Sequence, residues 1–228
     1  MIFHTFSKNN LTNGRCIIVY TFVINNLKMV NYTYLALGDS YTIGEQVPFA
    51  ENFPNQAVQL LRKTGFAFHA AEIIAKTGWT TDELSSAIEN TTTLEAYDIV
   101  SLLIGVNNQY RGRSASEFKI EFEHLLQKAI QFAGNRPYRV FVLSIPDWGV
   151  TPFAEGKQRG KIATEIDGYN YICETSSKEF QTNYINITPS QRADGNKAEF
   201  LAPDALHPSG MEYKKWAAKL ADGILKEI

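Results

Sequence analysis

Apolar runs alternate with amphipathic stretches from Tyr32 to the carboxyl end of the 228-residue chain. Short uninterrupted apolar runs are typical of strands buried on both faces, and longer stretches with one apolar face are typical of helices that cover a sheet. Their alternation predicts an α/β protein of strand–helix repeats around a parallel sheet. The strands we expect are Tyr32–Leu37, His69–Ala75, Asp98–Ile104, Arg139–Ile145 and Tyr184–Ile187. The helices we expect are Pro54–Lys63, Thr81–Asn90, Ser116–Ala133, Lys157–Thr182 and Pro208–Lys226.

Residues with useful chemistry follow four of these strands. Ser40 follows the first strand, Gly78 the second, Asn107 the third and Trp148 the fourth. In open parallel sheets, ligands bind beyond the carboxyl ends of the strands, where the connecting loops meet. We therefore expect the four loops to share one rim and to form a site there.

Ser40 is the candidate nucleophile, and it needs a base within hydrogen-bond reach. His207 is the candidate base, because it alone of the four histidines combines a strand-to-helix loop with a carboxylate, Asp204, three residues upstream. Asp204 would hold one ring nitrogen protonated, which leaves the other nitrogen to accept the Ser40 proton. The alternative interpretation is a helix N-terminal cap beside a surface histidine.

Attack by a serine on an ester creates negative charge on the carbonyl oxygen, which must be met by donors already in place. The sequence offers the backbone N–H of Ser40, the backbone N–H of Gly78 and the side-chain amide of Asn107. Taken singly, Gly78 could be a turn glycine and Asn107 could form an Asx turn. Together with Ser40 they predict an oxyanion hole.

Aromatic and basic residues near the same rim are candidates for substrate binding. Trp79 and Trp148 could wall an acyl pocket, although aromatic residues beside a sheet also belong to cores. Arg111 could bind a phosphate or carboxylate on the leaving group, or it could form a salt bridge within its loop. The sequence does not separate a short-acyl carbohydrate ester from an aryl ester or a lysophospholipid.

Composition narrows the choice of partners. A formal net charge of −2 and a pI near 6.1 give no broad positive field for nucleic acid, so we expect no nucleic-acid partner. Cys16 and Cys173 are too few for a disulfide framework and have no ligand cluster that would indicate zinc. We expect a small-molecule ester substrate, and the oligomeric state stays open.

The first 28 residues form a separate segment. The apolar run Cys16–Ile24 is shorter than a membrane span, and no small-x-small cleavage site follows it. We interpret residues 1–28 as an N-terminal extension, for which an upstream start is one explanation, with a signal segment as the alternative. Residues 29–228 then form a single catalytic domain without stable membrane insertion. This interpretation places the protein in the cytoplasm, and the alternative places it outside the cell or in the periplasm.

The motifs resemble those of the SGNH, or GDSL, hydrolases, a family of esterases and lipases. Gly38-Asp39-Ser40 is similar to the first family block, Gly78 to the glycine of the second, Gly105-Val106-Asn107 to the third, and Asp204 with His207 to the last. The resemblance implies a three-layer α/β/α fold with a flavodoxin-like parallel sheet of about five strands, esterase activity and no cofactor. One departure is Asn108, where the family block has Asp.

The residues and the resemblance together predict a serine esterase that hydrolyses small carboxylic esters through an acyl-Ser40 intermediate. Within the enzyme class, a carbohydrate acetylesterase or a lysophospholipase are the alternatives. Outside it, the chain could be a non-enzymatic, flavodoxin-like module that binds an anion or nucleotide at the loop after the first strand. Asp39 and Glu45 argue against that module, because they place negative charge beside the anion.

Overall fold

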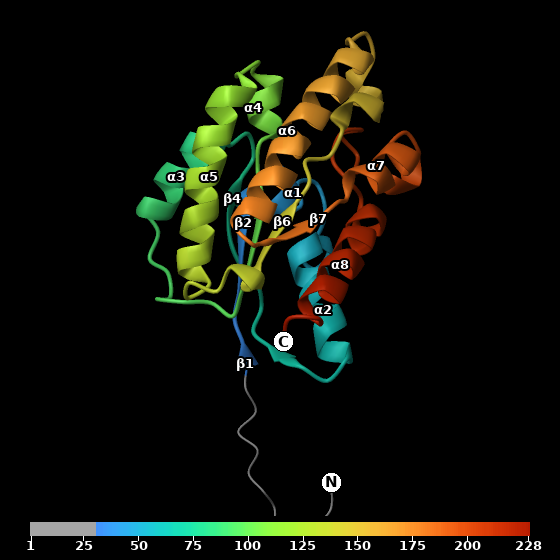
Figure 1. Cartoon of the computed structure of the whole chain (residues 1–228). Coiled ribbons are helices and arrows are strands. Elements are labelled where there is room, and N and C mark those ends of the chain that lie inside the picture. Colours follow the sequence, from blue (N-terminus) through green and yellow to red (C-terminus); the bar gives the residue numbers. More distant parts are fainter. Residues whose placement is uncertain (1–30) are drawn as a thin grey trace, which may run out of the picture.

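The computed structural model describes residues 31–228, in which five parallel strands form one sheet (Figure 1). The strand order is β4-β2-β5-β6-β7, which is 2-1-3-4-5 when these five are counted along the chain. This is the doubly wound order of flavodoxin-like sheets. The predicted fold class is therefore confirmed. The strands are β2 (Tyr34–Asp39), β4 (Glu72–Lys76), β5 (Ile99–Leu103), β6 (Val140–Leu143) and β7 (Asn183–Ile185).

Helices cover the sheet on both faces and give the three layers seen in Figure 1. Two of them, α2 (Phe53–Lys63) and α8 (Gly210–Ile224), pack against each other on one face. On the other face, α5 (Ala115–Phe132) packs between α3 (Thr81–Glu89) and α6 (Arg159–Glu179). Because both faces are covered, the strands can be apolar throughout.

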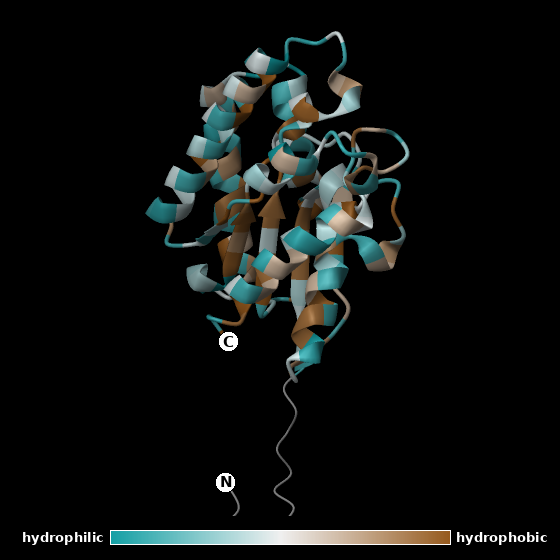
Figure 2. Cartoon of the chain, turned by 90° about the vertical axis from the view of Figure 1, so that its right-hand side faces the viewer, coloured by the Kyte–Doolittle hydropathy of each residue, from teal (hydrophilic) through white to brown (hydrophobic). Residues whose placement is uncertain are grey.

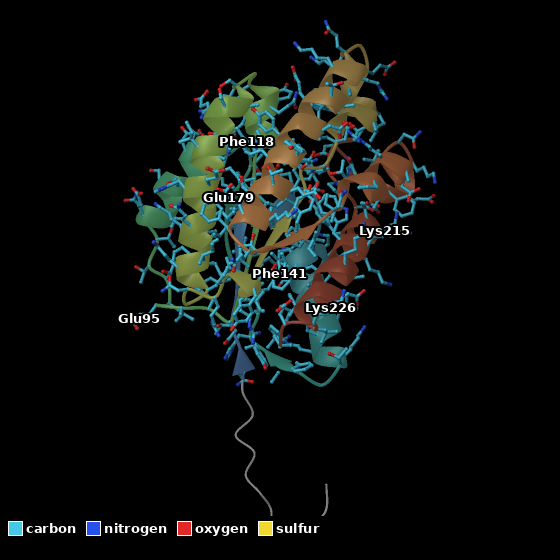
Figure 3. The ribbon with its side chains drawn as sticks, viewed as in Figure 1. Glu95, Phe118, Phe141, Glu179, Lys215 and Lys226 are labelled. Atoms are coloured by element: carbon cyan, nitrogen blue, oxygen red, sulfur yellow. The ribbon has the colours of Figure 1, made fainter. Side chains whose placement is uncertain are left out.

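The core lies between the sheet and the two helix layers. Every residue of β2 and β5 is buried, and Figure 2 shows apolar strands behind helices whose outer faces are hydrophilic. On one side, Phe118 of α5 stacks on Tyr169 of α6 with ring centroids 4.3 Å apart. On the other side, Trp216 of α8 is fully buried, so its large apolar surface is removed from water. In Figure 3, Phe118 and Phe141 lie inside the molecule, between the helices and the sheet, whereas Lys226 lies just beyond the carboxyl end of α8.

Several short elements have no counterpart in the sequence prediction. Helices of four to seven residues complete too few turns to show a 3.6-residue period, so pattern alone misses them. They are α1 (Ser40–Ile43), α4 (Val106–Tyr110) and α7 (Thr188–Asp194). Single 3₁₀ turns are also present at Phe49–Glu51, Pro137–Arg139, Trp148–Val150, Pro152–Ala154 and Ala198–Phe200.

Several predicted boundaries were wrong. The strand expected at His69–Ala75 is β4 at Glu72–Lys76, and the helix expected at Lys157–Thr182 is α6 at Arg159–Glu179. The first strand divides at Thr33, because β1 (Asn31–Tyr32) pairs with β3 (Ala67–Phe68) in a separate two-stranded sheet. The last helix does not begin at Pro208. Pro208 forms an antiparallel bridge with Leu201, and α8 starts two residues later behind a Ser209 cap that accepts the Met211 N–H.

The N-terminal extension predicted for residues 1–28 lies outside the described residues. Across residues 31–228, no helix is long and apolar enough to cross a bilayer. Over the same range, no cluster of three or more His, Cys, Asp or Glu side chains is placed to hold a metal ion.

Candidate active site

Ser40 lies where β2 becomes α1, at the carboxyl edge of the sheet. The carboxylate of Asp39 caps α1 by accepting the Tyr41 N–H at 3.0 Å. A side chain at Gly38 would place its Cβ 2.1 Å from the Thr42 Oγ1, so only glycine lets α1 pack this closely on the strand. The local sequence thus places Ser40 as the first residue of a helix, at the edge where the connecting loops meet.

A hydrogen-bonded chain joins Ser40 to His207 and Asp204. The Ser40 Oγ lies 2.9 Å from the His207 Nε2, and the His207 Nδ1 lies 2.6 Å from the Asp204 Oδ2. Because an ionised carboxylate only accepts hydrogen bonds, Nδ1 carries the proton and Nε2 is left to accept the Ser40 hydroxyl. The structure brings together the three residues predicted from the sequence, although Ser40 is separated from the other two by more than half the chain.

The loop that holds Asp204 is folded around its carboxylate. The Asp204 Oδ1 accepts the backbone N–H groups of Leu206 at 3.0 Å and His207 at 2.9 Å. Ala205 adopts a positive φ of 57°, which closes this tight turn. Partial burial works to raise the pKa of Asp204, but the hydrogen bonds from the His207 ring and from these N–H groups outweigh it and hold the pKa below its usual value. Asp204 is therefore ionised at neutral pH.

The pKa of Asp39 is shifted in the opposite direction from that of Asp204. Its side chain is fully buried, and burial raises its pKa to about 7, although the hydrogen bond from the Tyr41 N–H works against this shift. The Oδ1 atom caps α1, whereas the Oδ2 atom has no hydrogen-bond partner among the described residues. Two neighbouring carboxylates thus differ: Asp204 is stabilised as an anion and Asp39 is not.

Gly78 lies in the turn between β4 and α3. The Trp79 N–H donates to the Lys76 carbonyl at 3.2 Å, and Gly78 has a φ of +85°, which favours glycine. Within residues 31–228, the Gly78 N–H donates to no acceptor. A Cβ at Gly78 would find only the Arg111 Nη2 atom nearby, at 3.9 Å, so the space above the turn is open.

Asn107 is the second residue of α4, which follows β5. The chain turns sharply at Gly105, whose φ is +126°, and a Cβ there would lie 2.6 Å from the Phe118 ring. The Asn107 side-chain amide donates to the Trp79 carbonyl at 3.0 Å, which links it to the Gly78 turn. Since a primary amide carries two hydrogens, one remains for another acceptor.

Asn108, the departure from the family block, is a buried link between α4 and α3. Its Oδ1 accepts the Thr81 N–H at 3.1 Å, and its Nδ2 donates to the Thr81 Oγ1 at 2.6 Å. The Nδ2 also lies 3.5 Å from the Glu121 carboxylate. An amide can accept on one side and donate on the other, whereas an aspartate here would face Glu121 with a second negative charge.

The three residues predicted to bind substrate differ in their exposure. Trp79 is half-buried, and Trp148 is buried with its indole N–H donating to Gln109 at 2.7 Å. Two exposed aromatic rings flank Trp148 edge-on: Tyr110 at 5.3 Å and Phe153 at 6.1 Å between centroids. Phe153 also donates its N–H to the Ala205 carbonyl beside Asp204. Tyr110 was missed in the sequence analysis, and its position three residues after Asn107 was the available signal.

Arg111, the third of these residues, directs its guanidinium toward the protein. Its Nη2 donates to the Gly78 carbonyl at 2.7 Å, and its Nη1 lies 3.3 Å from the Glu83 carboxylate. Arg111 thus forms a salt bridge, as the alternative interpretation expected, but its partner lies in α3 and not in its own loop.

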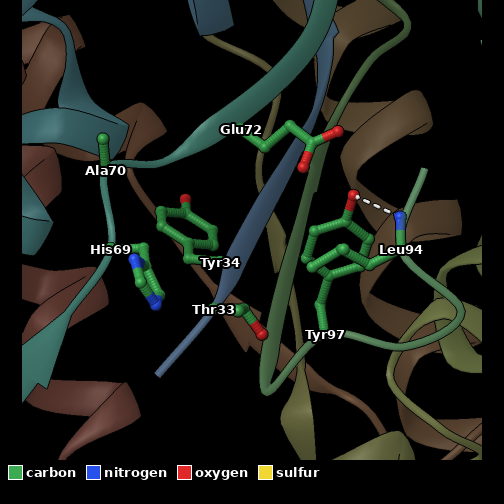
Figure 4. Close-up of a pocket in the computed structure, with 7 residues that line it drawn as sticks. All are labelled: Thr33, Tyr34, His69, Ala70, Glu72, Leu94 and Tyr97. Atoms are coloured by element: carbon green, nitrogen blue, oxygen red, sulfur yellow. Dashed lines mark hydrogen bonds between the residues drawn. The ribbon is translucent and has the colours of Figure 1, made fainter. Parts of the chain in front are cut away.

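The described chain also has a hollow at the opposite, amino-terminal edge of the sheet (Figure 4). Its volume is about 300 Å³, and the Leu94 N–H donates to the Tyr97 hydroxyl beside it. It is lined by Thr33, Tyr34, His69, Ala70, Glu72, Leu94 and Tyr97.

A parallel sheet in this order, with a serine, a histidine and an aspartate joined at its carboxyl edge, is the arrangement of a serine hydrolase. Residues 36–215 match the model of the GDSL-like lipase/acylhydrolase family. The chain belongs to this family and is a carboxylic ester hydrolase, as the sequence resemblance predicted.

Solved structures show the same fold at low sequence identity. A lipase/acylhydrolase from Enterococcus faecalis is 18% identical with a TM-score of 0.69, over 86% of this chain and 96% of that one. The esterase EstA from Pseudoalteromonas sp. is 17% identical with a TM-score of 0.63, over 86% and 98%. An acetylxylan esterase from Geobacillus stearothermophilus is 17% identical with a TM-score of 0.64, over 88% and 96%. The comparison with curated proteins finds no match.

Proposed function

We propose that the protein hydrolyses small carboxylic esters through an acyl-Ser40 intermediate, with His207 as general base and Asp204 as its partner. The observation that carries the proposal is the 2.9 Å contact between the Ser40 Oγ and the His207 Nε2, with Asp204 on the other ring nitrogen. Ser40 and His207 are both nearly buried, so water competes little for this contact.

The reaction proceeds in two steps. The Ser40 oxygen attacks the ester carbonyl while the His207 Nε2 takes the hydroxyl proton, and the Asp204 carboxylate stabilises the imidazolium that forms. The tetrahedral intermediate then expels the alcohol, which receives that proton from His207, and leaves an acyl group on Ser40. His207 then deprotonates a water molecule that attacks the acyl-enzyme. As the carboxylic acid leaves, the imidazolium returns that proton to the Ser40 oxygen.

The charge on the tetrahedral intermediate is stabilised by three donors in this proposal. They are the Ser40 N–H at the start of α1, the Gly78 N–H, and the second amide hydrogen of Asn107. Support comes from the Gly78 N–H, which is unpaired in the described part of the chain, and from the hydrogen bond that holds the Asn107 amide beside the same turn. Each such donor typically contributes about 10²–10³ in turnover.

Aromatic side chains form the substrate-binding wall in this proposal. Trp79 and Trp148 supply its buried part, and the exposed rings of Tyr110 and Phe153 supply the face that contacts the ligand. Flat aromatic surfaces of this kind suit the ring of a sugar or an aryl alcohol. The fold similarity to an acetylxylan esterase is consistent with a carbohydrate acetylester as substrate.

The non-enzymatic, anion-binding module gains no support from the loop after β2. The Asp39 carboxylate itself accepts the Tyr41 N–H at the start of α1, which is one of the donors that an anion would use. No feature of the loop therefore favours a bound anion over an ester.

The test is hydrolysis of p-nitrophenyl acetate and butyrate by Ser40→Ala, together with labelling by an organophosphonate. We expect turnover to fall by about 10⁴-fold or more and labelling to disappear. Ser86→Ala is the matched control, because Ser86 is exposed on α3 away from His207. Labelling or turnover that persisted in folded Ser40→Ala would assign the nucleophile elsewhere.

A further inference from the structure

Arg111 connects the helix that carries Asn107 to the turn that carries Gly78. It lies directly after α4, and its guanidinium donates to the Gly78 carbonyl at 2.7 Å. Asn107, four residues earlier, donates to the next carbonyl along the chain, that of Trp79, at 3.0 Å. Two successive carbonyls of the turn are thus held by side chains from one short helical segment.

Apart from the Trp79–Lys76 backbone hydrogen bond and the Asn107 contact, the Gly78 turn is held by Arg111. Glycine at a φ of +85° has wide conformational freedom, and a Cβ built there would meet no atom within 4 Å except the Arg111 Nη2. The Arg111 contact therefore restricts the backbone of a residue whose own N–H is unpaired in the described chain. The direction of that N–H depends on the backbone angles that the contact restricts.

The ion pair between Arg111 and Glu83 has a small effect on stability. The two side chains are 44% and 41% exposed, and exposed pairs contribute about 0–1 kcal/mol. The Glu83 carboxylate mainly caps α3, since the Thr80 N–H is the largest cause of its lowered pKa. Glu83 anchors the guanidinium beside Gly78, and loss of Arg111 should leave the fold intact.

We propose that Arg111 is a positioning residue of the oxyanion hole: it fixes the Gly78 turn so that the Gly78 N–H is aimed at the tetrahedral intermediate. This inference rests on the proposed function of Ser40 and Gly78. It assigns Arg111 a role in turnover, in place of direct binding to a charged leaving group, because Gly78 and Glu83 already occupy its guanidinium.

Arg113 supplies a matched control two residues further on. It also reaches the first turn of α3, with its Nη1 2.7 Å from the Asp82 carboxylate. Like Arg111 it pairs with more than one acceptor, since Glu121 lies 3.5 Å away. It makes no hydrogen bond to Gly78, so the two arginines differ in the one contact at issue.

The experiment compares Arg111→Gln, Arg111→Lys and Arg113→Gln by their kcat and KM on p-nitrophenyl acetate, a neutral ester. For Arg111→Gln we expect kcat to fall about 10-fold to 100-fold, less than for loss of a whole donor, with KM within about 2-fold. Arg111→Lys should recover part of the loss, because it keeps one charged donor. Arg113→Gln should keep the wild-type kcat, and all three should be folded by circular dichroism.

An aliphatic trifluoromethyl ketone provides the second measurement, since it adds to a serine and places an oxyanion in the hole. Its Ki should rise in Arg111→Gln by about the factor by which kcat/KM falls. Should Arg111→Gln not fold, Arg111→Ala assayed with millimolar guanidinium chloride against equal potassium chloride tests the same contact, and guanidinium should restore turnover.

Three results would overturn the inference. An unchanged kcat and Ki in Arg111→Gln would remove the positioning role while leaving the proposed function intact, provided Ser40→Ala is inactive. An equal loss in Arg113→Gln would mean that Arg111 acts only through the structure of α3. Ester turnover that survived Ser40→Ala would overturn this inference and the proposed function together.

Discussion

The two edges of the central sheet differ in what their polar groups are free to do. At the carboxyl edge, the Ser40 hydroxyl faces the His207 Nε2, and the Gly78 N–H is unpaired in the described chain. At the amino edge, the hydroxyl groups of Thr33, Tyr34 and Tyr97 beside the hollow of about 300 Å³ already bond within the fold. The Tyr34 hydroxyl pairs with Ser101 at 2.7 Å, and the Thr33 hydroxyl pairs with Asp98.

The direction of the chain explains the difference. In a parallel sheet every strand ends at the same edge, so the following helices begin there and present backbone N–H groups. Developing negative charge is therefore stabilised at the carboxyl edge, whereas the amino edge receives the carbonyl ends of helices. The hollow in Figure 4 lies at this amino edge, away from the helix N-termini.

The largest expected effect is on kcat, and it should distinguish the histidine at the carboxyl edge from the histidine at the amino edge. His207→Ala should lower kcat on p-nitrophenyl acetate by about 10⁴–10⁶-fold, close to the effect of Ser40→Ala, because triad members act as a unit. His69→Ala, at the amino-edge hollow, should retain wild-type kcat. Steady-state assays of both variants, with folding checked by circular dichroism, make the comparison. A strong loss in His69→Ala would show that the amino edge takes part in catalysis.

A second prediction concerns Asp39, the buried carboxyl group beneath the nucleophile. Its folded-state pKa of about 7 lies above the unfolded value, so between about pH 4 and 7 the folded state holds a proton that the unfolded state has lost. The free energy of unfolding should therefore fall as pH rises, by up to about 1.4 kcal/mol per pH unit from this group.

Asp39→Asn removes this titration and keeps a side-chain oxygen for the α1 cap. Urea unfolding of wild type and Asp39→Asn across this pH range measures the difference, which should grow in favour of the variant as pH rises and level off above pH 7. The lowered pKa of Asp204 works in the other sense, because its contribution to stability is lost only as pH falls through that pKa. A pH-independent difference would contradict the prediction for Asp39.

The smallest effect is expected for Asn108, whose side chain links α4 to the start of α3 through Thr81. Asn108→Asp should lower the free energy of unfolding by about 1–3 kcal/mol at neutral pH, because the new carboxylate would lie beside Glu121 and could not donate to Thr81. Thermal unfolding measures the loss. Adding Glu121→Gln should recover most of it, and failure of this second change to help would exclude charge repulsion as the cause.

Much of the fold could be predicted from the local pattern of apolar and polar residues. Alternating apolar runs and amphipathic stretches depend on residues close in sequence, so the class and the five sheet strands could be predicted, with boundary errors such as those at Thr33, His69 and Pro208. The short helices α1, α4 and α7 could not, because so few residues show no period. These short helices include the two that follow β2 and β5 and carry Ser40 and Asn107.

The sequence by itself determined the α/β class, the family and the identity of the residues that meet at the carboxyl edge, because these follow from short motifs and from where strands end. Only the tertiary structure decided their partners. It showed that Arg111 bonds to Gly78, that Trp148 is buried behind Tyr110 and Phe153, and that Asn108 faces Glu121. Such contacts mostly join different elements of the fold, and they depend on how those elements pack, which no local pattern specifies.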